Sequence, residues 1–553
     1  MNKPPSPSNP HTTTTPWLIS ALLIAIIFAV LVFVSNWAEP SWLALPVANG
    51  MEETAVSATV DQANCRYGIA AIGADHVPWV DTLGTGWYLS FQAAPFTQTP
   101  QNGAEFVHVI RVSEDKHPTE ALAQFSTFPA LTNGGLGALI DANPGALWLV
   151  GNEQDVSEVQ DDMRPSVYAR SYHTVYNFIK QRDPSAQVGI GGLSMMTPGR
   201  LQYLELVWDA YVGYFNQPMP VDVWNFHLYI LSEIRPWDGG NSDGRVAVGT
   251  DPALAKKAPL NANPALCSQA DVYCRAEHDS LPIFKEQVVA LRTWMKAHGE
   301  QNKPLILSEY SQLYPFVDYD DPVNPTQCFL QDENGKCFTE ARVNAFMNAT
   351  FDYLETAVDP NIGYPNDNYR LVQQWLWFSL LVPPEHSGGS SNLLKQNYTS
   401  FAPGSIGAFT GVGLNMDTQI FRHALAVNLK ASRAYAAIAT TDPISGTATA
   451  TLTADFYNNG NSTITDPFLV TFFKDPALTQ VIGSQTIDPN LRGCARHTYQ
   501  ATTTWPDLTP GTYRYWAKID STHAINESKS DNVVQGVVLI DPESVYLPLV
   551  TRP

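Results

Sequence analysis

The sequence predicts an α/β domain, a (β/α)₈ (TIM) barrel, followed by a small all-β sandwich, on three observations. The chain has 553 residues, which is too long for one hydrophobic core. From residue 65, short apolar runs alternate with longer amphipathic stretches, as in a parallel sheet with helical crossovers. After about residue 440, apolar and polar residues instead alternate with period two around turn-forming residues, which is typical of antiparallel strands.

The composition narrows the class of partner. A hydrophobic content of 44% with 11% aromatic residues is typical of a packed globular protein. The formal net charge is −21, from 53 acidic and 32 basic residues. Such a surface repels nucleic acid and acidic polymers, so we expect no nucleic-acid partner and favour neutral ligands.

The first element is a hydrophobic N-terminal helix. Residues 18–34, "LISALLIAIIFAVLVFV", carry no charge, and their length fits either a short membrane span or a long signal-peptide core. Lys3 precedes the run and Glu39 follows it, which leaves the N-terminus in the cytoplasm by the positive-inside rule. We therefore expect an extracytoplasmic protein, secreted or anchored by residues 17–37. Residues 1–40 are predicted to form the cytoplasmic N-terminus plus the anchor or signal peptide, and residues 41–64 are predicted to form a linker.

The barrel is assigned to residues 65–440. Helix-like segments separate several of its strands, among them 165–183, with a proline at its start, and 283–299, which closes on a glycine. A doubly wound open sheet is the alternative, but no Gly-rich phosphate loop follows the first strand. The eight expected strands are 67–73, 87–91, 106–112, 146–152, 187–193, 221–229, 304–310 and 372–378.

The six cysteines fit an exported protein. Two pairs are close in sequence and fall in the longest loops, 232–282 and 315–340, which follow the sixth and seventh strands. In a barrel such loops stand on the active-site face, so we expect disulfides that staple the walls of a cleft. No cysteine or histidine cluster has metal-ligand spacing, and no metal is expected. The expected pairs are Cys267–Cys274 and Cys328–Cys337, while Cys65 and Cys494 are either paired with each other or free.

The sandwich is assigned to residues 445–542. Period-two runs flank the turn "NNGN" (458–461), and further runs follow at 512–520 and 532–540. The stretches "FYNNGNSTITDPFLVTFF", "LTPGTYRYWAKID" and "INESKSDN" resemble the cell-adhesion-related bacterial (CARDB) domain, an immunoglobulin-like module. The resemblance implies a spacer or adhesive accessory without chemistry of its own. Residues 543–553 form an unassigned tail.

Two of the predicted barrel strands end in a carboxylate. The fourth, "ALWLVGNE", delivers Glu153, and the seventh, "KPLILSEY", delivers Glu309. The C-terminal ends of barrel strands line the active site, so the two side chains would face each other across the mouth. A pair of carboxylates in that place is what glycosidic bond cleavage needs, and it needs no cofactor.

Asn-Glu ending strand four, with Glu ending strand seven, resembles the clan A glycoside hydrolases over roughly residues 65–435. The resemblance implies that Glu153 is the acid/base and Glu309 the nucleophile, with retention of configuration. Asn152 would bind the 2-hydroxyl of a carbohydrate substrate. Retention requires carboxyl groups about 5–5.5 Å apart, whereas roughly 6.5–9.5 Å indicates inversion.

The same resemblance suggests the remaining site residues. His227 or Tyr229, at the end of strand six, would lie near the nucleophile. Trp375 and Trp377 end strand eight, where clan members carry an aromatic floor for the sugar, although one of the two is expected to pack in the core. Arg111 would steady the nucleophile from strand three, a departure from the clan's usual arginine on strand two.

The sequence thus predicts an exported retaining glycosidase that cleaves β-linked poly- or oligosaccharides. A general acid must be protonated, so we expect a raised pKa for Glu153 and an ionised Glu309. A Ser-His-Asp hydrolase would need a G-x-S-x-G elbow, which the sequence lacks. A non-catalytic cell-surface carbohydrate-binding or adhesion protein on a degenerate barrel remains the alternative.

Overall fold

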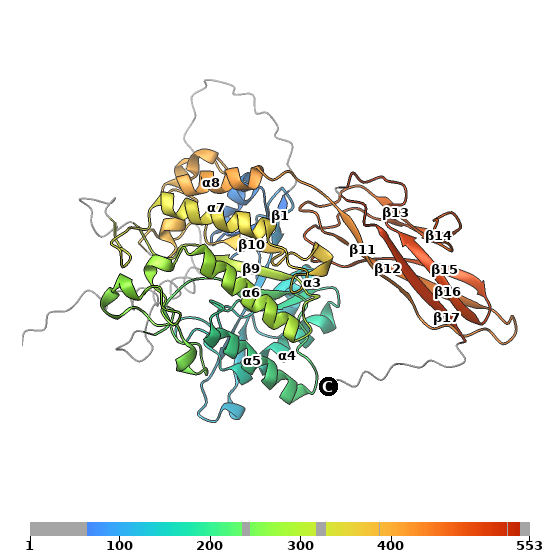
Figure 1. Cartoon of the computed structure of the whole chain (residues 1–553), viewed down its shortest axis with the longest axis horizontal. Coiled ribbons are helices and arrows are strands. Elements are labelled where there is room, and N and C mark those ends of the chain that lie inside the picture. Colours follow the sequence, from blue (N-terminus) through green and yellow to red (C-terminus); the bar gives the residue numbers. More distant parts are fainter. Residues whose placement is uncertain (1–62, 235–243, 317–327, 386, 528, 542–553) are drawn as a thin grey trace, which may run out of the picture.

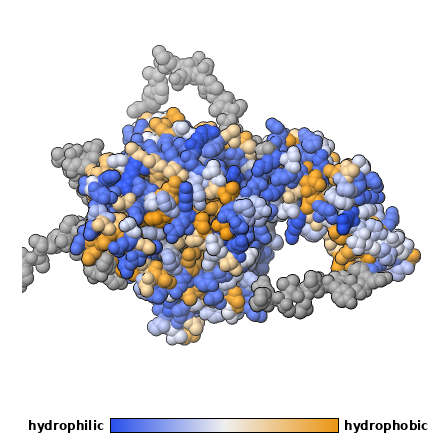
Figure 2. All heavy atoms as spheres, viewed as in Figure 1, coloured by the Kyte–Doolittle hydropathy of each residue, from blue (hydrophilic) through white to orange (hydrophobic). Residues whose placement is uncertain are grey.

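The structure is a computed structural model, and the predicted N-terminal helix, the linker and the tail lie outside the residues that it describes. None of the described helices is long and apolar enough to cross a membrane. On the face shown in Figure 2, apolar side chains are scattered among hydrophilic ones. The described residues are 63–234, 244–316, 328–385, 387–527 and 529–541.

The first domain is a mixed α/β unit built on parallel strands (Figure 1). One sheet has the order β3-β2-β1-β10-β9-β8, and a second has the order β5-β4-β6-β7 with only β5 antiparallel. The two sheets meet where Val107 alone separates β3 from β4, and where a parallel bridge joins Gly189 to Val223. The strands are β1 (Asn64–Ala70), β2 (Thr85–Leu89), β3 (Glu105–Phe106), β4 (His108–Glu114), β5 (Phe125–Phe128), β6 (Leu147–Val150), β7 (Gln187–Ile190), β8 (Trp224–His227), β9 (Leu305–Tyr310) and β10 (Gln374–Trp377).

Helices connect these strands, and they begin and end at residues expected from the sequence. Pro165 is the first residue of α4, and Gly299, with φ of 77°, follows the end of α6. The α-helices are α2 (Val77–Leu83), α3 (Ala138–Ala142), α4 (Pro165–Arg182), α5 (Pro198–Phe215), α6 (Leu281–Ala297), α7 (Glu340–Thr356) and α8 (Gly411–Phe421). Single turns are η2 (Ala74–His76), η3 (Glu120–Leu122), η4 (Asn133–Gly137), η5 (Pro252–Leu254), η6 (Leu260–Ala262), η7 (Pro264–Leu266), η8 (Arg275–Glu277), η9 (Pro365–Asp367), η10 (Gly389–Ser391), η11 (Tyr398–Ser400) and η12 (Ile406–Ala408).

Alternate residues of the strands pack into two separate cores. The cluster enclosed by the strands, here called the interior cluster, contains Ala70, Trp87, Leu89, Phe91, Val107, Val109, Leu147, Leu149, Val223, Ile306 and Leu376. The cluster between strands and helices, here called the helix-layer cluster, includes Ile69, Tyr88, Ile110, Trp148, Phe226 and Leu307. Membership of a cluster therefore shows which way a strand residue faces.

A β-bulge in β9 breaks this alternation. Leu307 is in register with Phe226 of β8, but the next residue in register with β8 is Glu309 and not Ser308. The extra residue lets both Leu307 and Tyr310 pack in the helix-layer cluster. Glu309 lies between them and so turns to the opposite side, which is the mouth of the domain.

The second domain is the predicted all-β sandwich. Its antiparallel sheets have the orders β11-β12-β15 and β14-β13-β16-β17, around a buried core that includes Leu452, Phe472 and Tyr515. β11 falls inside the range predicted for the barrel, so the sandwich begins before residue 445. The strands are β11 (Leu429–Ala436), β12 (Ala448–Asn458), β13 (Phe468–Phe473), β14 (Val481–Ile487), β15 (Tyr499–Leu508), β16 (Gly511–Lys518) and β17 (Val533–Ile540).

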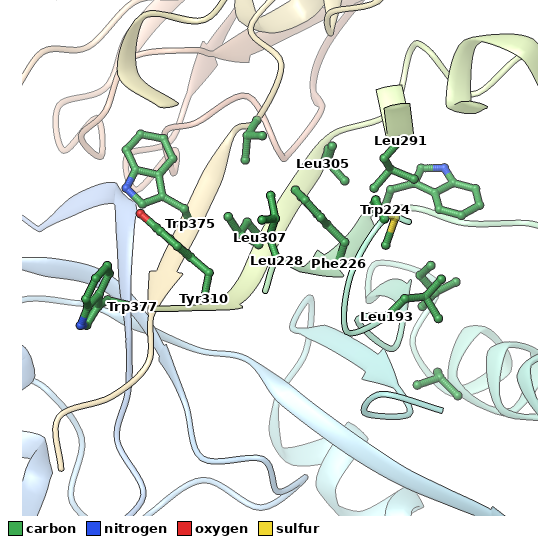
Figure 3. Close-up of a cluster of buried hydrophobic side chains, with 14 of the residues drawn as sticks. Leu193, Trp224, Phe226, Leu228, Leu291, Leu305, Leu307, Tyr310, Trp375 and Trp377 are labelled. Atoms are coloured by element: carbon green, nitrogen blue, oxygen red, sulfur yellow. The ribbon is translucent and has the colours of Figure 1, made fainter. Parts of the chain in front are cut away.

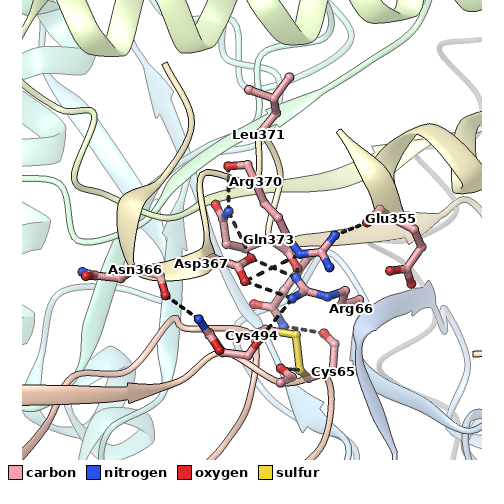
Figure 4. A network of polar contacts seen from close by, with 12 residues as sticks. Cys65, Arg66, Glu355, Asn366, Asp367, Arg370, Leu371, Gln373 and Cys494 are labelled. Atoms are coloured by element: carbon pink, nitrogen blue, oxygen red, sulfur yellow. Dashed lines mark hydrogen bonds and ion pairs between the residues drawn. A yellow bond between two sulfur atoms is a disulfide. The ribbon is translucent and has the colours of Figure 1, made fainter. Parts of the chain in front are cut away.

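The sandwich is fixed to the N-terminal ends of β1 and β10. A disulfide joins Cys65 of β1 to Cys494, which settles the pairing left open by the sequence. The adjacent Arg66 is 2% exposed and makes two 3.0 Å contacts with the carboxylate of Asp367 (Figure 4). It also donates to the carbonyl of Asn459 in the sandwich at 3.3 Å. The sandwich therefore lies at the N-terminal ends of the parallel strands, opposite the end that carries the predicted active site.

A cavity of about 380 Å³ lies at this junction and is lined by both domains. Burial opposes ionisation of Glu105 on its wall, yet Arg496 and Arg492 of the sandwich outweigh burial and lower the pKa of Glu105 to about 2. This buried ion pair fastens the sandwich to β3.

Candidate active site

Glu153 is aimed by a sharp turn at the end of β6. Gly151 has φ of 96° and Glu153 has φ of 46°, so both adopt the left-handed region that a non-glycine residue enters at a cost of about 1–3 kcal/mol. The turn is held because the Glu153 N–H donates to the carbonyl of Gly192, after β7, at 2.9 Å. The Glu153 side chain, from a residue only 8% exposed, is thereby directed over the C-terminal ends of the strands.

Glu153, His227, Tyr229 and Glu309, all predicted for the site, lie together. Tyr229 Oη donates to Glu309 Oε1 at 2.7 Å. His227 Nδ1 is 2.9 Å from Glu153 Oε1 and 3.7 Å from Glu309 Oε2. An oxygen of each carboxylate and the ring nitrogen all lie within 4.8 Å of one another. The two strand-end carboxylates therefore face each other across one histidine.

Burial raises the pKa of Glu309 to about 7. The charge of Glu153 adds to this rise, whereas His227, the hydrogen bond from Tyr229 and the charge of Arg111 oppose it. Burial thus opposes the ionised form of Glu309 expected from the sequence, and the expected partners Tyr229 and His227 offset burial only in part. The reason is that the bulge places this carboxylate in an enclosed position, where its nearest cation is shared with a second carboxylate.

His227 is favoured in its protonated form. Burial opposes a charge on the ring, but Glu309 and Glu153 outweigh burial and raise the pKa of His227. Gly192 leaves room for the ring in this position, because a Cβ there would lie 2.3 Å from His227 Cδ2. A proton on Nδ1 of His227 would therefore lie between the two carboxylates.

Asn152 and Arg111 share a buried carboxylate that the sequence analysis missed. Asp161 accepts the Asn152 N–H at 2.8 Å and Arg111 Nε at 2.6 Å. The Asn152 side chain donates to Gln160 at 3.1 Å. Arg111 follows Val109 of the interior cluster with period two along β4, so it faces the space enclosed by the strands. Asp161 and Gln160 lie in an acidic loop that carries no sequence signal for this role.

A second missed network lies behind Glu153. Asp155 accepts hydrogen bonds from Arg200 Nε at 3.0 Å and Ser194 Oγ at 2.9 Å, and Arg200 also pairs with Glu233. Asp155, Arg200 and Glu233 are completely buried. The network ties the loop that carries Glu153 to the segment after β7 and to α5, and so stabilises the position of Glu153.

The aromatic floor predicted at strand eight is not formed by Trp375 or Trp377. Both are fully buried in the helix-layer cluster, and Trp377 packs against Tyr310 with ring centroids 5.4 Å apart (Figure 3). Alternation along β10 points both rings away from the mouth. The next residue, Phe378, instead packs against the interior cluster, 6.0 Å from the ring of Phe91. Of the aromatic residues at this end of β10, Phe378 is therefore the one on the interior side of the strands.

The two stapled loops dock against each other beside the site. They follow β8 and β9, which carry His227 and Glu309. Glu333 of one loop accepts the N–H groups of Arg275 and Ala276 in the other, at 3.1 and 2.8 Å. The disulfides are bonded as predicted: Cys267–Cys274 and Cys328–Cys337.

Comparisons found similar solved structures, but no family model and no curated protein matches the chain. A GH128 (subgroup I) endo-β-1,3-glucanase from Amycolatopsis mediterranei, in complex with laminaritriose, is 14% identical with a TM-score of 0.35, covering 64% of this chain and 99% of that chain. A glucosidase from Croceicoccus marinus is 10% identical with a TM-score of 0.34, covering 80% and 93%. The CARDB domain of a Pyrococcus furiosus protein, in complex with di-metal ions, is 14% identical with a TM-score of 0.16, covering 21% and 96%. Identities and TM-scores this low do not assign the chain to a family.

Proposed function

We propose that the protein is a retaining glycoside hydrolase of the clan A type, acting on a poly- or oligosaccharide from a (β/α)₈ barrel. The observation that carries the proposal is the cluster of Glu153, His227 and Glu309 at the C-terminal ends of β6, β8 and β9. Glycosidic cleavage requires at least two carboxylates, one on either side of the bond that is cleaved.

The spacing of the carboxylates favours the two-step, retaining route. Oxygens of Glu153 and Glu309 lie within 4.8 Å of each other. This fits the separation of about 5–5.5 Å in retaining enzymes better than the roughly 6.5–9.5 Å that leaves room for a water in inverting enzymes.

In the proposed reaction Glu309 attacks the anomeric carbon while Glu153 gives a proton to the departing oxygen. Glu153 then takes a proton from water, and that water displaces Glu309 and restores the original configuration. Tyr229 orients the nucleophile through its 2.7 Å hydrogen bond. His227, 2.9 Å from Glu153, holds a proton beside the acid/base between the two steps. Asn152, next to Glu153 in the chain, is proposed to bind the 2-hydroxyl.

We also propose that the protein acts outside the cytoplasm, secreted or anchored by residues 17–37. The three disulfides, which form in oxidising compartments, support this location. The sandwich, fixed at the end of the barrel remote from Glu309, is proposed as a CARDB-like spacer that leaves the mouth open to a glycan.

Hydrolysis of a polysaccharide panel tests the proposal. The panel contains β-1,3-, β-1,4- and mixed-linkage glucans, xylan and mannan, and reducing ends are measured for the wild type and for Glu309→Gln. We expect hydrolysis of at least one glycan by the wild type and a loss of at least 10³-fold in Glu309→Gln, because the nucleophile is absent. Equal activity of the two proteins would place the chemistry elsewhere, and binding without hydrolysis would favour the carbohydrate-binding alternative.

A further inference from the structure

An exposed aromatic ring stands at the rim of the mouth. Among the described residues, Phe128 is the most exposed of the large aromatic side chains, at 71%. It ends β5, the strand that returns along the upper part of β4. Covering an exposed phenyl ring with an apolar surface lowers the free energy. The position of the ring therefore determines which ligand it can bind.

The strand pairing fixes the face on which the ring lies. Val109 of β4 belongs to the interior cluster, and Arg111 and Ser113 follow it on the same face with period two. Phe128 is directly opposite Arg111 in the antiparallel pair, and directly opposite residues share a face. Ser113 Oγ lies 2.8 Å from Ser126 Oγ, which shows independently that these two faces coincide. Phe128 therefore extends the inner wall of the barrel sideways, from β4 to β5.

Arg111 connects this wall to the chemistry. Its guanidinium is paired with Asp161, whose carboxylate also accepts the N–H of Asn152, the residue before Glu153, at 2.8 Å. Cross-strand neighbours have Cβ atoms about 5 Å apart. Phe128 thus lies one step beyond Arg111, away from the carboxylate pair and towards solvent.

We infer, on the basis of the proposed function, that Phe128 is a stacking platform for a pyranose unit of the bound glycan beyond the two units whose bond is cleaved. A phenyl ring offers a flat apolar surface and no hydrogen-bonding group, so it contacts the C–H face of a sugar without reading its hydroxyls. Phe128 then increases the affinity for long glycan chains and does not change the affinity for a single sugar unit.

The experiment measures binding, so that it does not depend on hydrolysis. Titration calorimetry is carried out on full-length Glu309→Gln and on Glu309→Gln with Phe128→Ala, Phe128→Trp or Phe421→Ala. Phe421, on α8, is 55% exposed and contacts Gly84 at the opposite end of the barrel, so its removal is the matched control. The probes are laminaripentaose, cellopentaose, xylopentaose and mannopentaose, with the corresponding monosaccharides.

We expect Phe128→Ala to weaken the binding of the preferred pentaose about tenfold, the order of one aromatic contact, and to leave monosaccharide binding unchanged. Phe128→Trp should retain the affinity, and Phe421→Ala should have no effect. Unchanged pentaose binding in Phe128→Ala, an equal loss for pentaose and monosaccharide, or no pentaose binding at all would overturn the inference. Pentaose binding that depends on Phe128 in a protein whose wild type hydrolyses nothing would refute the proposed enzyme while keeping the platform.

Discussion

At the scale of single residues, the centre of the site is His227, which lies between Glu153 and Glu309. His227 Nδ1 lies 2.9 Å from one carboxylate and 3.7 Å from the other, and the two carboxylates raise its pKa. Burial raises the pKa of Glu309 to about 7. The charge state of Glu309 therefore depends on its neighbours in the site. This coupling gives two predictions.

The first prediction concerns the pH dependence of activity. Only the ionised carboxylate of Glu309 can attack, so kcat/KM should fall about tenfold per pH unit below a pH near 7. Arg111 lowers the pKa of Glu309, so Arg111→Gln should move this acid limb to higher pH. A pH–rate profile measured from pH 4.5 to 9 checks both points. A wild-type profile that stays flat down to pH 4.5 contradicts the assignment of Glu309 as an enclosed nucleophile.

The second prediction concerns stability. Folding raises the pKa of Glu309 from 4.5 to about 7, so the stability that its protonated form contributes is present below pH 4.5 and is lost as the pH rises to 7. Glutamine stays neutral. The stability of Glu309→Gln relative to the wild type should therefore improve by about 3 kcal/mol between pH 4.5 and pH 8, at about 1.4 kcal/mol per pH unit. Urea unfolding at both pH values measures this change, and the exposed Glu158→Gln is the control. A difference that does not change with pH speaks against the raised pKa.

At the scale of elements, the position of the site is determined by the C-terminal ends of the strands and by the β-bulge in β9. The sequence was enough to predict that Glu153 and Glu309 end strands and meet, because each follows an apolar run that can be recognised in the sequence. The bulge at Ser308 is not visible, since period two alone would put Leu307 and Glu309 on the same face. The tryptophans of β10 failed as site residues for a related reason: a strand end shows that a residue is near the mouth, but not which way it faces.

A glycine at a strand end gives the third prediction. Gly192→Ala would place a Cβ 2.3 Å from the His227 ring, so the ring must shift from its present position 2.9 Å from Glu153. We expect a loss in kcat/KM of about 10²-fold, the order of a misplaced catalytic contact. Gly213→Ala is the matched control, since a Cβ there meets nothing within 4 Å and it lies in α5, where alanine stabilises by about 0.5–1 kcal/mol. Full activity in Gly192→Ala would show that the position of His227 is not required.

At the scale of the whole molecule, the two domains are joined as one body. The disulfide Cys65–Cys494, the buried pair Arg66–Asp367 and the pair Glu105–Arg496 all cross or support one junction. The sequence could not predict this, because the partners are up to 429 residues apart and nothing in either segment marks how the sandwich docks. Short-range cysteine pairs, in contrast, followed directly from their spacing.

The junction gives the fourth prediction. The disulfide closes a loop of 429 residues, so its removal should lower the free energy of unfolding by several kcal/mol, up to about 5. The Cys65→Ser, Cys494→Ser double variant should unfold earlier in calorimetry and retain its activity, because the site lies at the other end of the barrel. Removing Cys267 and Cys274 instead should reduce activity more than stability, since that bridge supports a loop beside the site and closes only a short loop. Equal effects of the two replacements on activity would contradict this division.

Azide rescue tests most directly the central claim that Glu153 and Glu309 divide the work of a retaining glycosidase. Glu153→Ala and Glu309→Ala are each incubated with an activated aryl glycoside of the preferred sugar and with sodium azide, and the glycosyl azide is examined by NMR. The account predicts that Glu153→Ala, which still forms the glycosyl–enzyme, is accelerated by azide and gives a product of unchanged anomeric configuration. It predicts that any azide product of Glu309→Ala has the opposite configuration, because azide then attacks the substrate directly. Exchanged patterns would reverse the two roles, and full activity of both variants without azide would contradict the account.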